Sequence, residues 1–382
     1  MQAGNGNPRV RAMARATATA AFILIGFRGL WAALPGDALL DFGSFVASGR
    51  AAAQSQDAYG IHPLTFHVVL PGFESFNPNL NPPISVLVFQ LFDIVDPHTG
   101  FRIWWAVSLL CYAATVALLV RRYGRSEKLL LTAWAFALAG FWDTLVLGQI
   151  YLPLVLMAAI AWLSLERGRW RTASLLIGLV IAFKPNFLVW PAVLLLAGHG
   201  RTAVGSFAAA ALISLLPMPI YGAELYARWI ELVLSDSGRA AFLTNVSMIG
   251  LTARMERPWL GSVLGLLLLA GVAVWAWRRR PPAVPASELA LVAALLASPL
   301  AWVHYTLFLM PVILRNRRSA PMCLAAVMLT VPVWTVLRLL TASPWAIVTV
   351  GSLYAWATVL VLVALLAREG DPAASPAEAA VA

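Results

Sequence analysis

Residues 172–199 read TASLLIGLVIAFKPNFLVWPAVLLLAGH, and this stretch decides the topology of the chain. It is mostly apolar, with Lys184-Pro185-Asn186 near its centre. A helix needs ~20 apolar residues to cross a bilayer, so the stretch forms either one long kinked helix or two short ones. Proline disfavours helix at the residue before it, and a lysine in the membrane is costly without an aqueous or paired site. We therefore predict two short helices that meet at an aqueous cavity beside Lys184.

The composition places the whole chain in a membrane. Of its 382 residues, 61% are hydrophobic and 12% are charged, whereas soluble domains carry about 25% charged residues. We predict an all-α polytopic membrane protein with about 12 spans, a second pair being split at Ser298-Pro299. The predicted spans are 17–35, 101–120, 129–142, 150–165, 172–184, 185–199, 202–221, 258–277, 287–300, 301–314, 320–341 and 345–367.

Arginine clusters fix the predicted orientation. With the N-terminus inside, the split spans put every cluster on the cytoplasmic side, as the positive-inside rule requires. The clusters are Arg121-Arg122-Tyr123-Gly124-Arg125, Arg167-Gly168-Arg169-Trp170-Arg171, Arg201, Arg278-Arg279-Arg280 and Arg315-Asn316-Arg317-Arg318. This distribution accounts for the net charge of +10 and argues against a nucleic-acid partner. Polar residues such as Asp41, Asp143, Lys184 and His304 then gather on the non-cytoplasmic face.

One continuous transmembrane domain is predicted, with two large outer loops. The first apolar run is long and contains Arg28, so we interpret it as an uncleaved span and not as a signal peptide. Within the first loop, residues 80–95 are short, apolar and flanked by proline; they predict an interfacial helix, although a spanning segment stays open. The predicted regions are 1–16 (cytoplasmic segment), 17–367 (transmembrane domain), 36–100 and 222–257 (outer loops) and 368–382 (disordered cytoplasmic tail).

Three polar residues at predicted outer helix ends are candidates for chemistry. Asp41 follows the first span, where a carboxylate either caps a helix or, if partly desolvated, acts as a general base. Gln149 can bind sugar hydroxyls or hold neighbouring helices together. Lys184 can bind a lipid-linked phosphate or can extend toward the interface.

Further candidates lie later in the chain, with one in the first span. Asn245, within Thr244–Leu251, either caps a helix or lines the site. His304 follows Ser298-Pro299 and is either a packing residue or a donor to a phosphate or leaving oxygen. Trp302 of the same stretch is assigned to the donor site, and Arg28 is a third candidate phosphate partner.

The ordered set of these motifs resembles glycosyltransferase family 87. Its members include polyprenol-phosphate-mannose-dependent mannosyltransferases that extend phosphatidylinositol mannosides. The resemblance implies a C-type glycosyltransferase fold, a polyprenyl-phosphate sugar donor and an inverting mechanism without a nucleotide sugar. It is carried by Asp41-Phe42, Gly148-Gln149, Ala182-Phe183-Lys184-Pro185, Asn245-Val246-Ser247 with Gly250-Leu251, and Ser298-Pro299-Leu300-Ala301-Trp302-Val303-His304-Tyr305.

By this resemblance Asp41 is the general base, while Lys184 and His304 meet the donor phosphate. Two motifs depart from the family: Asn81-Pro82-Pro83 replaces a usual Tyr-Pro-Pro, and Asn245-Val246-Ser247 replaces Asn-Gln-Ser. The implied partners are the lipid-phosphate donor, a glycolipid or glycan acceptor and membrane lipids. We expect no cofactor and no metal, because lysine and histidine can neutralise one phosphate.

The predicted function is transfer of a sugar, mannose by the resemblance, on the non-cytoplasmic face of the plasma membrane. A lipid or sugar transporter or flippase is the alternative, since broken helices also occur there. A purely structural membrane subunit is a third reading, which leaves Lys184 and His304 unexplained. The sequence leaves open the donor sugar, the acceptor, the linkage and the oligomeric state.

Overall fold

A computed structural model describes residues 8–369, most of which are helical. The predicted tail from 370 onward and the first seven residues lie outside the described part. Within it, four helical stretches are long and apolar enough to cross a membrane. They are α1 (Pro8–Ala33), α4 (Pro97–Tyr123), α10 (Gly200–Ser214) with α11 (Met218–Tyr221), and α14 (Pro258–Arg279). The architecture is that of a polytopic helical membrane protein; twelve spans and the C-type fold stay predictions.

The other apolar helices are shorter. They are α7 (Tyr151–Glu166), α8 (Trp170–Phe183), η3 (Pro185–Leu188), α9 (Val189–Leu196), α15 (Ala283–Leu296), η5 (Val303–Leu309), α16 (Met310–Arg315) and α20 (Leu353–Glu369). The helix breaks at Lys184, between α8 and η3, where φ is −139° and ψ is 84°. The cause is Pro185, which disfavours a helical conformation at the residue before it. A second break separates α15 from η5 around Pro299.

Three spans expected to be continuous are interrupted. Residues 129–142 fall in α5 (Lys128–Ala137) and α6 (Ala139–Leu147), which are bent by 45° relative to each other. If this bent pair is taken as one span, the described residues contain five candidate spans. The backbone N–H of Ala139, freed by that bend, donates to the Leu329 carbonyl at 2.9 Å. Leu329 lies in the turn that divides 320–341 into α17 (Ala320–Met328) and α18 (Val333–Leu337). A further turn separates α19 (Pro344–Val348) from α20.

The first outer loop contains a hairpin that the all-helical prediction missed. Its elements are α2 (Leu40–Ala53), β1 (Phe66–Leu70), β2 (Phe73–Asn77), α3 (Pro83–Gln90) and η1 (Leu91–Ile94). The two strands are antiparallel, with Phe66 opposite Asn77 and Leu70 opposite Phe73. Gly72 in the connecting turn has a φ of +76°, which glycine adopts without strain. Short amphipathic strands of this kind give a weak pattern in so apolar a chain.

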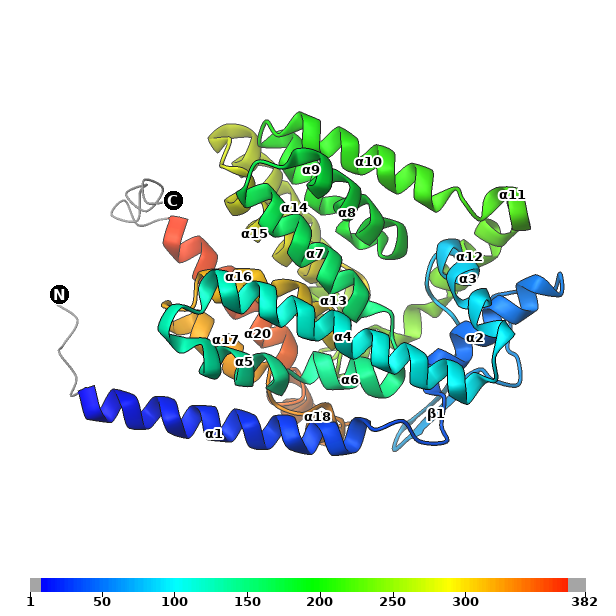
Figure 1. Ribbon diagram of the computed structural model, residues 1–382, viewed down its shortest axis with the longest axis horizontal. Coiled ribbons are helices and arrows are strands. Elements are labelled where there is room, and N and C mark those ends of the chain that lie inside the picture. Colours follow the sequence, from blue (N-terminus) through cyan, green and yellow to red (C-terminus); the bar gives the residue numbers. More distant parts are fainter. Residues whose placement is uncertain (1–7, 370–382) are drawn as a thin grey trace.

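The second outer loop is also structured. It contains α12 (Glu224–Ser235), η4 (Asp236–Ala241) and α13 (Met248–Ala253). Trp229 of α12 donates from Nε1 to the Leu80 carbonyl at 3.2 Å, which joins the two loops. In Figure 1, α2, α3, β1 and α12 lie together at the right-hand end of the molecule, while α1 begins and α20 ends at the left.

Ion pairs link several of the basic segments with one another. Glu127, in η2 (Arg125–Glu127), contacts Arg15 at 3.0 Å and Arg317 at 3.4 Å. Buried Glu288 contacts Arg315 at 2.7 Å. Segments that are far apart in sequence therefore meet at the end of the molecule where α1 begins, away from the two outer loops (Figure 1).

Candidate active site

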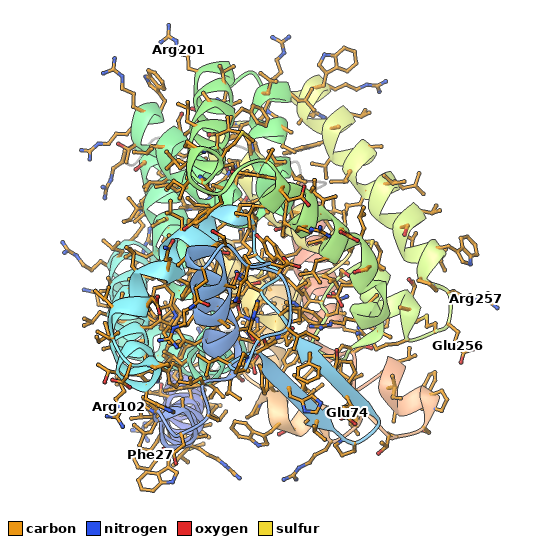
Figure 2. The ribbon with its side chains drawn as sticks, turned by 90° about the vertical axis from the view of Figure 1, so that its right-hand side faces the viewer. Phe27, Glu74, Arg102, Arg201, Glu256 and Arg257 are labelled. Atoms are coloured by element: carbon orange, nitrogen blue, oxygen red, sulfur yellow. The ribbon has the colours of Figure 1, made fainter. Side chains whose placement is uncertain are left out.

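A cavity of about 1160 Å³ opens among the two outer loops and the broken helices. Its walls are mainly apolar, from side chains such as Phe45, Leu80, Trp142 and Phe242. Figure 2 views the end of the molecule where the hairpin lies, with Glu74 labelled on it. The charged or titratable side chains that line this cavity, apart from tyrosines, are Asp41, Asp143, Lys184, Asp236, Arg239 and His304.

Asp41 lies in the first turn of α2 and is only 2% exposed. A carboxylate there faces the positive end of the helix dipole. Gly148 brings the next polar residue close: its φ is +69°, and a Cβ at this position would lie 2.6 Å from the Phe42 Cβ. Glycine is therefore required for the chain to pass α2 and to place Gln149 beside Asp41.

Two amide side chains hold the Asp41 carboxylate. Gln149 donates from Nε2 to Oδ2 at 2.6 Å, and Asn77 donates from Nδ2 to Oδ1. Burial raises the pKa of Asp41 from 3.8 to about 6, although these two hydrogen bonds oppose the rise. Asp41 lies outside the membrane-length helices, and with this pKa it can exchange a proton near neutral pH.

Lys184 projects into the same cavity from the break between α8 and η3. Its ammonium donates to Asn81 Oδ1 at 2.7 Å and lies 4.2 Å from the centre of the Tyr151 ring. The side chain is buried, and its hydrogen-bonded partner is an uncharged amide. An ammonium has three donors, so Lys184 keeps capacity to bind an anion that enters the cavity.

His304 lies in η5, beside a carboxylate from α6. Its Nε2 is 2.6 Å from Asp143 Oδ2, an ion-pair contact whose angles do not meet those of a hydrogen bond. The ring stacks on Tyr151 with centroids 5.0 Å apart. His304 is 3% exposed yet lines the cavity, so it can present a donor to a bound group.

The remaining predicted site residues divide into lining and supporting positions. Trp302 lines the cavity next to His304. Asn245 does not line the cavity but stabilises the segment that contains Pro299 and Ala301. Its Nδ2 donates to the Pro299 carbonyl at 3.1 Å, and its Oδ1 accepts from the Ala301 N–H at 3.1 Å. Arg28 is an exposed residue of α1 whose guanidinium lies 5.8 Å from the Trp334 ring centre; it is also outside the lining.

Asn77, Asn81, Asp236 and Arg239 also lie at the cavity and were not among the predicted site residues. Asn77 and Asn81 hold Asp41 and Lys184, and Asp236 and Arg239 form an ion pair at 2.8 Å. A signal for the first two was present, because three asparagines alternate with proline and leucine over residues 77–81 of a very apolar chain. Arg239 gave no such signal, since an arginine in a polar loop is usually solvated.

Comparison with known proteins shows the family of the chain. Residues 79–299, more than half of the chain, match the family described as Glycosyltransferase family 87. Together with the apolar helices, this match defines the protein as a membrane glycosyltransferase. The chain belongs to glycosyltransferase family 87, as its motifs predicted.

One curated relative comes from Mycobacterium tuberculosis. It is named polyprenol-phosphate-mannose-dependent alpha-(1-2)-phosphatidylinositol mannoside mannosyltransferase, and it is 26% identical over 299 residues, which cover 69% of each chain. No solved structure matches the chain significantly.

Proposed function

We propose that this protein transfers mannose from a polyprenyl-phosphate carrier to a hydroxyl of a glycolipid or glycan acceptor. One observation carries the proposal: a carboxylate, an ammonium and an imidazole from distant parts of the sequence line a single, mainly apolar cavity. These groups are Asp41, Lys184 and His304. A lipid-linked sugar phosphate presents an apolar chain, one anionic group and a reactive carbon, and each has a complementary feature in this cavity.

The donor phosphate binds at Lys184. This ammonium is buried, is held by Asn81 and is not neutralised by a hydrogen-bonded carboxylate. A phosphate that contacts it gains a charge-assisted hydrogen bond in a region of low dielectric. His304 approaches the same phosphate from η5, where its Nε2 lies 2.6 Å from Asp143 Oδ2.

Asp41 acts as the general base of an inverting displacement. Its carboxylate takes the proton of the acceptor hydroxyl while that oxygen attacks the anomeric carbon from the face opposite the phosphate. The bond between the anomeric carbon and the phosphate oxygen breaks, and its electron pair leaves with the polyprenyl phosphate. Lys184 and His304 stabilise the charge that develops on this leaving group. The enzyme supplies mainly orientation and electrostatic stabilisation.

The choice of mannose and of a polyprenyl carrier is supported by the mycobacterial relative, whose name contains both. The same name suggests a phosphatidylinositol mannoside as one acceptor to test. The proposed side is the non-cytoplasmic face of the plasma membrane, because the cavity lies among loops 36–100 and 222–257, whereas several basic segments, which favour the cytoplasm, meet at the other end of the molecule.

The test is transfer of radiolabelled mannose in isolated membranes. Polyprenyl-phosphate-mannose and a nucleotide-mannose are compared as donors, with Asp41→Asn protein as the control for the base. We expect transfer from the lipid donor alone and at least a 100-fold lower rate in the variant, a typical contribution of a general base. Near-normal transfer by the variant would refute the role of Asp41. Transfer from the nucleotide sugar alone would refute the donor class.

A further inference from the structure

Arg239 of η4 forms a bridge between the second outer loop and the hairpin. Its Nη2 donates to the Phe76 carbonyl at 2.6 Å and to Ser75 Oγ at 3.3 Å, while Nε contacts Asp236. Its Nη1 donates to Asn77 Oδ1. The guanidinium is therefore committed within the protein, and its side chain is only 12% exposed. These contacts make it a poor candidate for binding substrate directly.

The contact with Asn77 has a consequence for Asp41. A guanidinium carries donors and has no acceptor, so it must face the carbonyl oxygen of the Asn77 amide. The other end of that amide, Nδ2, then points at Asp41 Oδ1 and donates to it. Ser44 Oγ donates to the Asn77 carbonyl at 2.7 Å, which fixes the backbone of this residue against α2 as well. Arg239 thus favours the same amide orientation that the ionised Asp41 carboxylate, which only accepts, requires.

We propose that Arg239 is a positioning residue for Asp41 and acts through the amide of Asn77. The inference rests on the proposed function, in which Asp41 is the base. Asn77 holds one carboxylate oxygen and Gln149 holds the other, which fixes the plane of the carboxylate. A hydrogen bond to the charged form also favours ionisation against the effect of burial. Removing Arg239 removes one of the two contacts that orient this amide and weakens both effects.

Other ionisable groups face Asp41, and the experiment leaves them unchanged. Asp143 comes from α6, Tyr151 from α7, Lys184 from the end of α8 and His304 from η5. Because all four stay in place in an Arg239 variant, a change in the titration of Asp41 reports the loss of Arg239, which removes both its charge beside Asp236 and its contact with Asn77. A double variant with Asn77→Leu separates the contact with Asn77 from the effect of the charge.

The first measurement does not need substrate. The Asp41 carboxyl band is isolated by subtracting the infrared spectrum of Asp41→Asn protein from that of its parent over a range of pH. In otherwise unchanged protein we expect a midpoint of about 6. In Arg239→Met we expect it to rise by about one pH unit, roughly the effect of one hydrogen bond to a charged group. An unchanged midpoint in folded Arg239→Met would overturn the inference.

The matched control is Arg228→Met. Arg228 lies on α12 and pairs only with Glu224 and Glu231 among the described residues, and it is 52% exposed. The Arg228→Met substitution removes the same charge from a neighbouring element, and the midpoint of the Asp41 titration should not move. If Arg239→Met does not fold, Arg239→Lys keeps the charge but lacks the planar fork, and a smaller upward shift is expected.

A double variant tests the route through Asn77. Asn77→Leu should raise the midpoint at least as far as Arg239→Met, and adding Arg239→Met to Asn77→Leu should change it little further. Fully additive shifts would refute the route.

The pH dependence of mannose transfer then separates this inference from the proposed function. For Arg239→Met we expect a rate about fivefold lower at pH 6 that recovers to within about twofold at pH 8.5. An unshifted midpoint with inactive Asp41→Asn would overturn only the coupling. A shifted midpoint with active Asp41→Asn would overturn only the role of Asp41 as base.

Discussion

Replacing Asp41 by asparagine is expected to stabilise the folded protein even though the proposed mechanism expects it to lower transfer at least 100-fold. The pKa of Asp41 is raised from 3.8 to about 6 by burial. Each pKa unit corresponds to about 1.4 kcal/mol, so ionised Asp41 costs about 3 kcal/mol of folding free energy at pH 7.5. The folded state binds the extra proton, and stability therefore falls as pH rises from about 4 through about 6. Below pH 4 this cost is absent.

Asparagine fits the site without a new unsatisfied group. Arg239 keeps the Asn77 amide oriented as a donor, so the oxygen of the new side chain accepts from it. Gln149 can turn its own amide and accept from the new Nδ2. Because hydrogen bonds to a charged group are stronger than neutral ones, about 3 kcal/mol is the upper bound of the gain.

The assay is thermal unfolding of detergent-purified protein, followed by tryptophan fluorescence at pH 7.5 and pH 4. Asp41→Asn should unfold a few degrees higher than the unchanged protein at pH 7.5, and the difference should disappear at pH 4. Asp37→Asn is the control, since it removes an exposed carboxylate from the segment that connects α1 to α2. A variant that is less stable at both pH values would refute the reasoning, because burial of the charge would then not dominate.

Two further predictions concern the donor site and the turn that carries Gln149. Lys184→Gln should raise the KM for the lipid donor by about 10- to 100-fold, the effect of a lost charge-assisted hydrogen bond, whereas Lys128→Gln, at the chain's other and exposed lysine, should not. An equal effect of the two would contradict a phosphate site at Lys184. Gly148→Ala should lower stability by about 1–3 kcal/mol and reduce transfer, because φ is +69° and the new methyl would meet Phe42. Gly168→Ala measures the backbone strain alone, since Gly168 has a φ of +66° and nothing within 4 Å of an added Cβ. Equal losses of stability in both variants would show that the contact with Phe42 is unimportant.

The helix breaks that shape the cavity were predictable because their causes are local. The Lys-Pro pair at 184–185 forbids a regular helix at a position where a buried charge also needs a polar site. The bend at Leu138 has no such local signal. It depends on the Leu329 carbonyl, almost two hundred residues later, accepting from Ala139. A break whose freed N–H is satisfied by a distant segment is visible only in the folded chain.

The candidate site likewise contains residues that the sequence could predict and contacts that it could not. Asp41, Lys184 and His304 were identifiable because titratable side chains are rare and costly in apolar surroundings. Two of their partners, Asn77 and Asn81, are amides in the first outer loop, where asparagine is an ordinary residue type. The importance of Asn77 arises from the hairpin register that places it at the end of β2, beside α2. Strand register and loop docking are set by long-range packing, so the sequence pattern could not predict that contact.

The separation of charges in the cavity explains why this site is built at a cost in stability. Asp41 is bound by two amides, and Lys184 is bound by one amide and the face of Tyr151. Pairing the carboxylate directly with the ammonium would satisfy both ions, since each would lower the energy of the other in this low-dielectric region. That pair would also lower the pKa of the proposed base and occupy the cation proposed to bind the donor phosphate. Neutral partners instead hold each ion in place and leave its charge available, so the interaction that compensates their burial is the one made with the substrate.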